Sequence, residues 1–374
     1  MQHGLYIHVP FCLSKCNYCD FYSVTPGDRR DKEEYLDALN IEMEGVAADF
    51  RPRSVYIGGG TPTVLNVDEL KRLFSILQAH VDLEQVSEFT MEANPGTLTS
   101  ENTALIKEMG VNRVSLGAQT FDSEVLKLLG RGHSAEDVQE AWRILADAGI
   151  ANRSLDLMFA VPGTGRDHML ADCKRLLELD SEHVSAYALS IEEGTPLHFQ
   201  YESGLIEAMD EDIAREQYDL LREFLADNGY RHYEISNFSK EGFECLHNQL
   251  YWSGGEYIGC GPSAHSHWRG RRFSNTANLW QYTRSFLAGT VPIGMEETLA
   301  DSEKACETLV MSLRRLEGVE VEDFENRTGF SPYQLRGEEI ERLIDDGLLE
   351  LSANRLRLTE QALFISDTVF RELV

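Results

Sequence analysis

The stretch HVPFCLSKCNYCDF, residues 8–21, places Cys12, Cys16 and Cys19 in a C-x3-C-x2-C pattern. The pattern directly follows an apolar run, LYIHVP, that is typical of a buried strand. Thiolates grouped in this way are ligands for soft metals, namely zinc, copper(I) or an iron–sulfur cluster. The fold therefore has to present this stretch as a metal-binding loop at the end of a strand.

Three thiols leave more than one kind of metal site open. A structural zinc site has four ligands, so His8 or a distant cysteine would have to complete it. A 4Fe–4S cluster held by protein alone also takes four cysteines, and three would leave one iron open for a cosubstrate. The other four cysteines are dispersed and are predicted to be small buried side chains: Cys173, Cys245, Cys260 and Cys306.

Outward from this loop, the first two thirds of the chain alternate between strands and helices. The predicted strands are 5–10, 54–60, 88–94, 113–119, 154–162 and 183–191. The predicted helices are 31–47, 67–79, 99–109, 134–148 and 166–179. This order indicates right-handed βαβ units and a parallel sheet whose carboxyl edge carries the chemistry. An open sheet and a partly closed barrel share the rhythm, so spacing alone leaves both possible.

The rhythm changes in the last third of the chain. One further helix ends at Gly229, and an aromatic, glycine-rich stretch follows it. Beyond about residue 290 the chain is helical and acidic, with a hairpin predicted to turn at 352–354. We therefore predict an α/β core over 1–235, an extension over 236–290 and a small winged-helix-like domain over 291–374.

Composition argues against several classes of partner and location. The chain has 374 residues and a formal net charge of -29, from 63 acidic and 34 basic side chains. Such a field repels phosphate backbones, so a nucleic-acid partner is not expected. No stretch resembles a membrane span or a secretory signal, and the odd number of cysteines does not suggest a disulfide framework. We expect a soluble cytoplasmic protein.

Two further motifs mark predicted strand ends, and one acidic residue lies inside a predicted strand. GGGTP, residues 58–62, lets the backbone approach a ligand, but a tight strand-to-helix turn would use the same residues. Glu92 in EANP is a candidate acceptor for a hydroxyl or ammonium group, with a capping or surface role as the alternative. Asp156 lies within an apolar strand and has to be paired or functional.

The cysteine pattern, with the aromatic Tyr18 before the third cysteine, resembles the radical S-adenosylmethionine (radical SAM) superfamily. The resemblance implies a partial (β/α)6 barrel and a 4Fe–4S cluster on Cys12, Cys16 and Cys19. The open iron would be chelated by S-adenosylmethionine, whose cleavage releases a 5′-deoxyadenosyl radical. It also implies a set of residues that contact S-adenosylmethionine: Tyr6, Tyr18, Gly59, Gly60, Thr61, Glu92, Gln119, Arg131 and Asp156.

Within the superfamily, the motifs are similar to oxygen-independent coproporphyrinogen III oxidases and HemW-type haem chaperones. The shared stretches are YIHVPFCLSKCNYCDF, GGGTP, RVSLGAQTF, HVSAYALSIEEGT, YEISNFSKEG and HNQLYW. The oxidases carry another cysteine where this chain has Phe21, and a sizeable segment ahead of the cluster where this chain has eleven residues. Both differences favour the haem chaperone branch. Ala160 and Thr164 depart from the glycine and glutamine expected in the relatives.

The motif HNQLYW, residues 247–252, is associated with haem binding in that branch, so His247 is the predicted haem ligand. On a helix, His247 and Tyr251 would share a face. The alternative is a hydrogen-bonded piece of core. His265 and His267 are possible second ligands, although loop hydrogen bonds would also account for them. His8 and His133 could support their neighbouring motifs.

The predicted function is therefore that of a haem chaperone that binds a 4Fe–4S cluster, S-adenosylmethionine and haem. Its implied partner is a haem acceptor, a respiratory enzyme, with no individual acceptor or electron donor indicated by the motifs. The alternatives are a coproporphyrinogen III oxidase, another radical enzyme such as a methyltransferase, and a zinc-binding module, because a fold does not fix a function.

Overall fold

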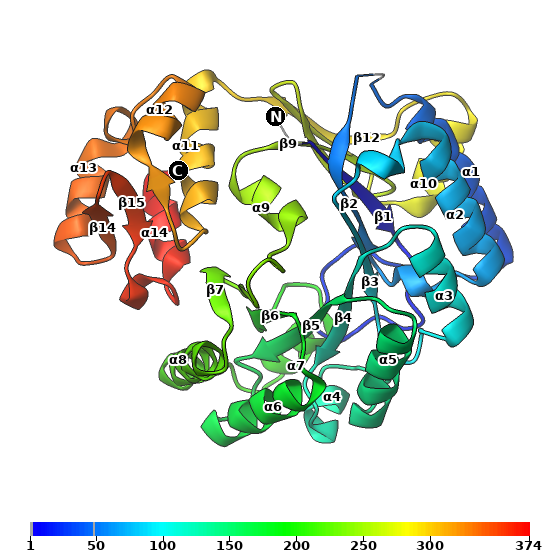
Figure 1. The fold of residues 1–374 in the computed structure, drawn as a ribbon, viewed down its shortest axis with the longest axis horizontal. Coiled ribbons are helices and arrows are strands. Elements are labelled where there is room, and N and C mark those ends of the chain that lie inside the picture. Colours follow the sequence, from blue (N-terminus) through cyan, green and yellow to red (C-terminus); the bar gives the residue numbers. More distant parts are fainter. Residues whose placement is uncertain (1–2, 48) are drawn as a thin grey trace.

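Six parallel strands in chain order form a curved sheet in the computed structural model, which describes residues 3–47 and 49–374 (Figure 1). The strands are β1 (His3–Val9), β2 (Pro52–Gly59), β3 (Glu88–Ala93), β4 (Arg113–Gln119), β5 (Asn152–Phe159) and β6 (His183–Ala188). The helices that connect them on the outer face are α1 (Arg29–Glu44), α2 (Val67–His80), α3 (Ser100–Glu108), α4 (Ser123–Leu128), α5 (Ala135–Asp147) and α6 (Arg166–Leu179). The predicted partial barrel is confirmed.

Capping side chains determine where the connecting helices begin. Thr99 and Ser134 each accept a hydrogen bond from the third amide of their helix. Caps of this kind are each worth about 1 kcal/mol. At the other end of α5, Gly149 has a φ of 73°, a conformation that ends a helix readily without a side chain.

Alternation along the strands separates the core from the inner surface of the barrel. Leu5 and Ile7 of β1 are fully buried in the hydrophobic core that the outer helices complete. Burial of each such side chain stabilises the fold by about 1.5–3 kcal/mol. Tyr6 and His8 alternate with them and therefore face the other side of the sheet. The concave face of the barrel is polar, and the site lies there.

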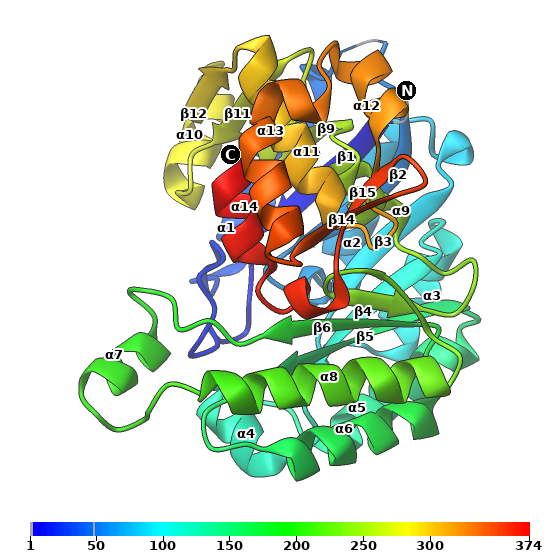
Figure 2. The same cartoon turned by 90° about the vertical axis from the view of Figure 1, so that its left-hand side faces the viewer.

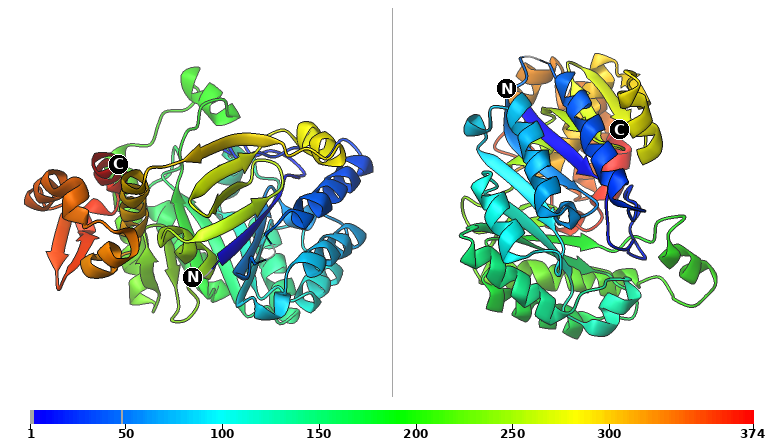
Figure 3. Two further views of the ribbon diagram at one scale, coloured as in Figure 1. Left: turned by 90° about the horizontal axis from the view of Figure 1, so that it is seen from above. Right: turned by 90° about the vertical axis from the view of Figure 1, so that its right-hand side faces the viewer.

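The sheet continues beyond the six barrel strands at both edges, to twelve strands in all among the described residues. Beside β6 lie β8 (Asn237–Ser239) and β7 (Arg231–Glu234); beyond β1 lie β9 (Glu256–Cys260), β10 (His265–Trp268), β11 (Arg271–Asn275) and β12 (Ile293–Thr298) (Figure 3). β9 runs parallel to β1, and the others pair antiparallel. The three-part domain division remains a prediction, but pairing with β11 includes β12 in the main sheet.

Four more helices belong to this part of the chain: α7 (Pro196–Glu202), α8 (Glu211–Asp227), α9 (Leu246–Trp252) and α10 (Leu279–Leu287). Figure 2 shows α7 projecting away from the main body. α9 lies inside the curve of the sheet, against β1 and β2, and it carries the HNQLYW motif (Figure 1). The motif therefore occupies the concave side of the barrel rather than its helical exterior.

The C-terminal part packs four helices against a small sheet. The helices are α11 (Asp301–Leu313), α12 (Val321–Thr328), α13 (Pro332–Asp345) and α14 (Ser366–Leu373), and the strands are β13 (Val319–Glu320), β14 (Leu349–Ser352) and β15 (Arg355–Leu358). Ala353 and Asn354 turn the predicted hairpin with positive φ angles of 49° and 62°, which suit a tight two-residue turn. Among the described residues, no helix is both long and apolar enough to cross a membrane.

Candidate functional site

The three clustered cysteines lie on the loop between β1 and α1, and all three are half-buried. Two main-chain hydrogen bonds hold this loop. Cys12 N donates to the Val24 carbonyl at 3.0 Å, which joins its two halves, and Asn17 N donates to the Leu129 carbonyl at 2.9 Å, which fixes its middle. The loop therefore rests on the carboxyl edge of the sheet, where the chains of β2, β3 and β4 also end.

A continuous chain of polar contacts surrounds two of the cysteines. Thr61 Oγ1 lies 3.7 Å from the Cys12 sulfur and accepts a hydrogen bond from Asn94 at 2.8 Å. Asn94 Oδ1 accepts from Arg131 at 2.8 Å, and the same guanidinium donates to the Cys16 sulfur at 3.3 Å. We call these residues, together with Cys19, the cluster corner.

Three features of the cluster corner suit an iron–sulfur centre: the soft sulfur donors, a cavity beside them, and a glycine that lets the backbone pack closely. A cavity of about 190 Å³ is lined there by Cys16, Thr61 and Arg131. A Cβ atom on Gly60 would lie 2.6 Å from the Phe11 carbonyl oxygen. Glycine at this position, directly after β2, therefore lets the cysteine loop pack closely against the end of the strand. Among the described residues, no three ligand side chains already surround one point. The fit therefore rests on the soft donors and their spacing.

Cys16 and Cys12 lie close enough to Cys19 to affect the pKa of its thiol. Burial, together with the nearby Cys16 and Cys12, raises the pKa of Cys19 to about 11. A bound iron cation would reverse this preference and favour thiolates. His8 does not complete a zinc site here, because its Nε2–H donates to the Tyr22 carbonyl at 2.8 Å while Nδ1 lies 3.1 Å from the Tyr6 hydroxyl.

Two acids predicted to contact S-adenosylmethionine lie on the concave face of the barrel. The Tyr56 hydroxyl donates to Glu92 at 2.8 Å, and the Gly59 amide donates to the same carboxylate at 3.1 Å. Burial raises the pKa of Glu92 to about 7, against the effect of the Tyr56 hydrogen bond. Asp156 accepts from Ser115 at 2.9 Å, and burial raises its pKa as well. Both acids are therefore hydrogen-bonded, but neither forms a salt bridge with a described residue; Arg113 acts on both only from a longer range.

Gln119 and Arg131 converge on Gly117, where β4 bulges against β5. Gln119 is buried and has a φ of 68°. With this backbone conformation, its side-chain amide lies beside Gly117, next to the Arg131 guanidinium. The Arg131 guanidinium also donates to the Gly117 carbonyl. Tyr18 packs nearby against the small apolar group that includes Met158. β-bulges often re-aim side chains beside functional sites, which is consistent with this position.

The structure thus brings most of the predicted S-adenosylmethionine contacts to one edge, although their binding role stays a prediction. Sequence reasoning did not select Asn94 or Tyr56. Asn94 is the third residue of the EANP motif and directly follows β3, which carries Glu92. Tyr56 lies two residues before Gly58 on the same face of β2. Period-two alternation from the selected residues would have indicated Tyr56.

His247, the predicted haem ligand, is buried with 1% of its surface exposed. Its Nδ1 lies 2.9 Å from the Ser54 hydroxyl, and its Nε2 lies 2.8 Å from the Tyr251 hydroxyl. Burial lowers its pKa to about 3, and the nearby Arg113 acts in the same direction. Both ring nitrogens are therefore engaged, and iron could reach Nε2 only if Tyr251 released it.

A buried carboxylate fixes the start of α9. Glu88, at the beginning of β3, accepts from the amides of Leu246 at 2.8 Å and His247 at 3.0 Å. Arg113 is buried beside it at the beginning of β4, and Glu88 favours its charged form. α9 is thus anchored at the amino ends of the strands, opposite the cluster corner.

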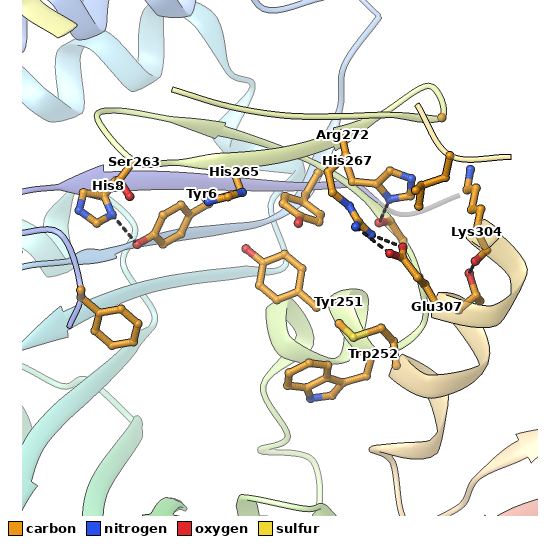
Figure 4. A pocket seen from close by; sticks show the side chains of 18 of the residues that line it. Tyr6, His8, Tyr251, Trp252, Ser263, His265, His267, Arg272, Lys304 and Glu307 are labelled. Carbon is orange, nitrogen blue, oxygen red and sulfur yellow. Dashed lines mark hydrogen bonds and ion pairs between the residues drawn. The ribbon is translucent and has the colours of Figure 1, made fainter. Parts of the chain in front are cut away.

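A second, larger cavity of about 520 Å³ lies between α9, the added strands and α11 (Figure 4). Tyr251 and Trp252 from the end of α9 form one side, and His265 and His267 from β10 form the other. Tyr257 from β9 also lines the cavity. We call it the aromatic cavity. Its volume is in the range that holds organic ligands in proteins.

The two ends of the aromatic cavity differ in polarity. One end is lined by Tyr6, His8 and Phe21, the last of which is 67% exposed and lies two residues after Cys19. At the other end, the Arg272 guanidinium pairs with Glu307, and Lys304 lies beside them without an ion pair among the described residues (Figure 4). The cavity can therefore take a flat, largely apolar ligand with acidic groups at one side.

Comparison with known proteins agrees with this architecture. Residues 6–176 match the radical SAM superfamily, and residues 299–365 match the HemN C-terminal domain. The chain is 36% identical to the heme chaperone HemW of Lactococcus lactis subsp. lactis, across 100% of this chain and 97% of that protein. The chain belongs to the HemW family of radical SAM proteins. A second HemW relative, from Bacillus subtilis, is 34% identical over 98% of this chain and 97% of its own length.

The fold of this HemW family member is also found in a solved structure. Coproporphyrinogen III oxidase (HemN) from Escherichia coli, a radical SAM enzyme, superposes with a TM-score of 0.86. The match covers 100% of this chain and 90% of the oxidase at 20% identity, which shows a common fold. Membership of the radical SAM superfamily implies a 4Fe–4S cluster and S-adenosylmethionine.

Proposed function

We propose that this protein is a haem chaperone, which binds haem as cargo and passes it to an acceptor protein, a respiratory enzyme, in the cytoplasm. The observation that carries the proposal is the aromatic cavity beside the cluster corner, with imidazoles, aromatic rings and a cationic end. Imidazole nitrogen is a common axial ligand of haem iron, and aromatic rings pack on the macrocycle. The HemW relatives that share the whole length of this chain are named heme chaperones.

The proposal assigns the cluster and S-adenosylmethionine to the cluster corner. Cys12, Cys16 and Cys19 would hold a 4Fe–4S cluster, which supplies an open iron for the cosubstrate and an electron for its cleavage. Arg131 stabilises the negative charge of the Cys16 thiolate through its hydrogen bond to the sulfur. Glu92 and Asp156 offer carboxyl oxygens to donors of the cosubstrate.

A titration with haem tests the central claim. The full-length protein, reconstituted with its cluster under anaerobic conditions, is titrated with ferric haem while the absorption spectrum is recorded. We expect a saturable change with one haem per chain, followed by transfer of the haem to an added apo-acceptor. Absence of saturation would reject the proposal.

A matched pair of tryptophan variants locates the binding. Trp252 lines the aromatic cavity, whereas Trp280 on α10 is 67% exposed. We expect Trp252→Ala to weaken haem binding by about tenfold, since a buried aromatic contact of this kind is worth about 1–3 kcal/mol. Trp280→Ala should leave the affinity unchanged. Equal effects of the two changes would place haem elsewhere.

The alternative activity has its own assay. Coproporphyrinogen III, S-adenosylmethionine and a reductant are incubated anaerobically with the reconstituted protein. We expect no conversion to protoporphyrinogen, because Phe21 stands where the oxidases carry a further cysteine. Turnover would make the protein an oxidase.

A further inference from the structure

Two imidazoles of β10 line the aromatic cavity from the same side of the sheet. His265 and His267 alternate with Ser266, so their side chains leave the same face of the strand. Ser266 is buried on the opposite face, where its hydroxyl accepts from the Gly259 amide at 2.9 Å. The sequence HSH therefore presents both rings to the cavity, as Figure 4 shows.

Of these two rings, His267 is held in the protonation state that a metal ligand needs. Its Nδ1 lies 3.3 Å from the Gly255 carbonyl oxygen. A carbonyl oxygen only accepts, so Nδ1 carries the proton and Nε2 of the neutral ring keeps its lone pair. Metal-ligating histidines commonly donate their second nitrogen to a backbone carbonyl in this manner.

His265 and His247 lack this combination. His265 is exposed, and its ring has no hydrogen-bond partner within the described part of the chain. His247 has partners on both nitrogens and is almost fully buried. His8 also lines the cavity and donates Nε2–H to the Tyr22 carbonyl, but its Nδ1 lies 3.1 Å from the Tyr6 hydroxyl. Among the described histidines of the cavity, only His267 joins a fixed tautomer to a second ring nitrogen that has no hydrogen-bond partner.

We propose that His267 coordinates the iron of the haem cargo through Nε2, and that His247 is a positioning residue that acts through Tyr251. This inference rests on the proposed haem-chaperone function and deepens it by naming the ligand. The step is coordination alone: the Nε2 lone pair forms the Fe–N bond, the Nδ1 proton stays on the ring, and iron keeps its oxidation state.

A chain of aromatic contacts connects His247 to the cavity. The Tyr251 hydroxyl lies 2.8 Å from His247 Nε2, and the Tyr251 ring meets Tyr257 edge-on with centroids 4.6 Å apart. Tyr257 in turn meets His267 edge-on at 6.4 Å. A change at His247 therefore alters the position of the Tyr251 ring in the cavity wall without removing a ligand from iron.

The test compares three single variants of the full-length, cluster-reconstituted protein in haem titrations read by absorption and electron paramagnetic resonance. We expect His267→Ala to weaken binding by about 10- to 100-fold and to change the spectrum of bound haem. Added imidazole should restore that spectrum, an effect that a merely structural role would not give. His198→Ala, on α7 and outside the lining of the cavity, is the control and should change the affinity by less than about threefold.

His247→Ala should weaken binding by up to about tenfold while the spectrum keeps its type, and His247→Gln should restore part of the affinity. An unchanged spectrum in His267→Ala would overturn the inference, as would a spectral loss in His247→Ala that imidazole restores. If His267→Ala fails to fold by circular dichroism, His267→Met replaces it: a thioether ligand should shift the spectrum, and no shift overturns the inference. Wild-type protein that does not saturate with haem rejects the proposed function itself, a separate result.

Discussion

The cluster corner draws its side chains from residues 12 to 131, whereas the aromatic cavity draws on residues from 6 to 311. The first lies where loops follow β1, β2, β3 and β4, so the parallel order of the barrel alone brings its parts together. The second needs β9 to pair with β1, α9 to enter the barrel and α11 to close one side. One site follows from repeated local units, and the other from long-range contacts.

The two sites adjoin at the end of the cysteine loop. Asp20, Phe21 and Tyr22 follow directly after Cys19 and line one end of the aromatic cavity. Even so, the buried groups that support each site differ: Glu92 supports the strand ends of the cluster corner, and Glu88 anchors α9. The comparison therefore predicts that each site can be damaged while the other is retained.

The largest expected effect is at the cluster corner. Cys16→Ala removes one of three thiolates, so the reconstituted protein should lose almost all cluster iron and sulfide, as measured by metal analysis and visible absorption. Haem affinity should change by less than about threefold. Cys173→Ala, a buried cysteine on α6, is the control and should retain the cluster. Loss of haem binding together with the cluster would contradict the separation of the two sites.

Glu88→Gln should damage the aromatic cavity and leave the cluster corner intact. The change leaves Arg113 buried without the nearby carboxylate and weakens the bonds to the first amides of α9. We expect the free energy of unfolding in urea to fall by about 3 kcal/mol and haem affinity to fall with it, while cluster content is retained. Glu84→Gln, at an exposed position, should have no effect. Equal stability of Glu88→Gln and wild type would argue against this anchor.

The pH dependence of the unfolding free energy tests whether Glu92 is protonated in the folded protein. Its pKa is about 7 in the folded protein against an ordinary value of 4.5, so between these pH values the folded state holds a proton that the unfolded chain has released. The unfolding free energy therefore falls as pH rises through this window. We expect Glu92→Gln to gain up to about 3 kcal/mol relative to wild type between pH 4.5 and pH 7.5 in urea titrations. A constant difference across that range would exclude a proton on Glu92.

The smallest effect is expected at the rim of the aromatic cavity. Lys304→Ala removes a cation that would face the acidic groups of haem, and we expect about a threefold loss of affinity that disappears at high salt. Lys107→Ala, on exposed α3 surface, is the matched control. A salt-independent loss would indicate that Lys304 acts through packing instead.

The part of the fold that repeats was predictable from the sequence. Each barrel strand and its helix show their own hydrophobic period, and caps such as Thr99 and Ser134 mark where helices start. The resemblance then selected the partial barrel over an open sheet. The cluster corner could be predicted in outline because most of its motifs end strands, and parallel strands end at one edge, whereas Arg131 follows α4. Asn94 was missed because only its contacts with Thr61 and Arg131 distinguish it.

The aromatic cavity was not predictable in the same way. No strands were predicted within residues 256–275, because glycines interrupt the apolar pattern there. The pairing of β9 with β1 also joins residues about 250 positions apart in the sequence, which no local pattern indicates. The resemblance marked His247 for haem, but burial and its two hydrogen bonds emerge only when α9 is packed against β2. The role of His267 depends on a carbonyl twelve residues away in sequence, Gly255.

By itself, the sequence determined a three-thiolate loop on a βα scaffold, since ligand spacing and hydrophobic period are local properties that one stretch of chain contains in full. The tertiary structure decided which imidazole faces open space and which is enclosed, because burial and hydrogen-bond partners depend on segments that meet only after folding. His247 and His267 have the same imidazole side chain, but His247 is enclosed in the protein while His267 lines the aromatic cavity, so the two rings differ in chemistry.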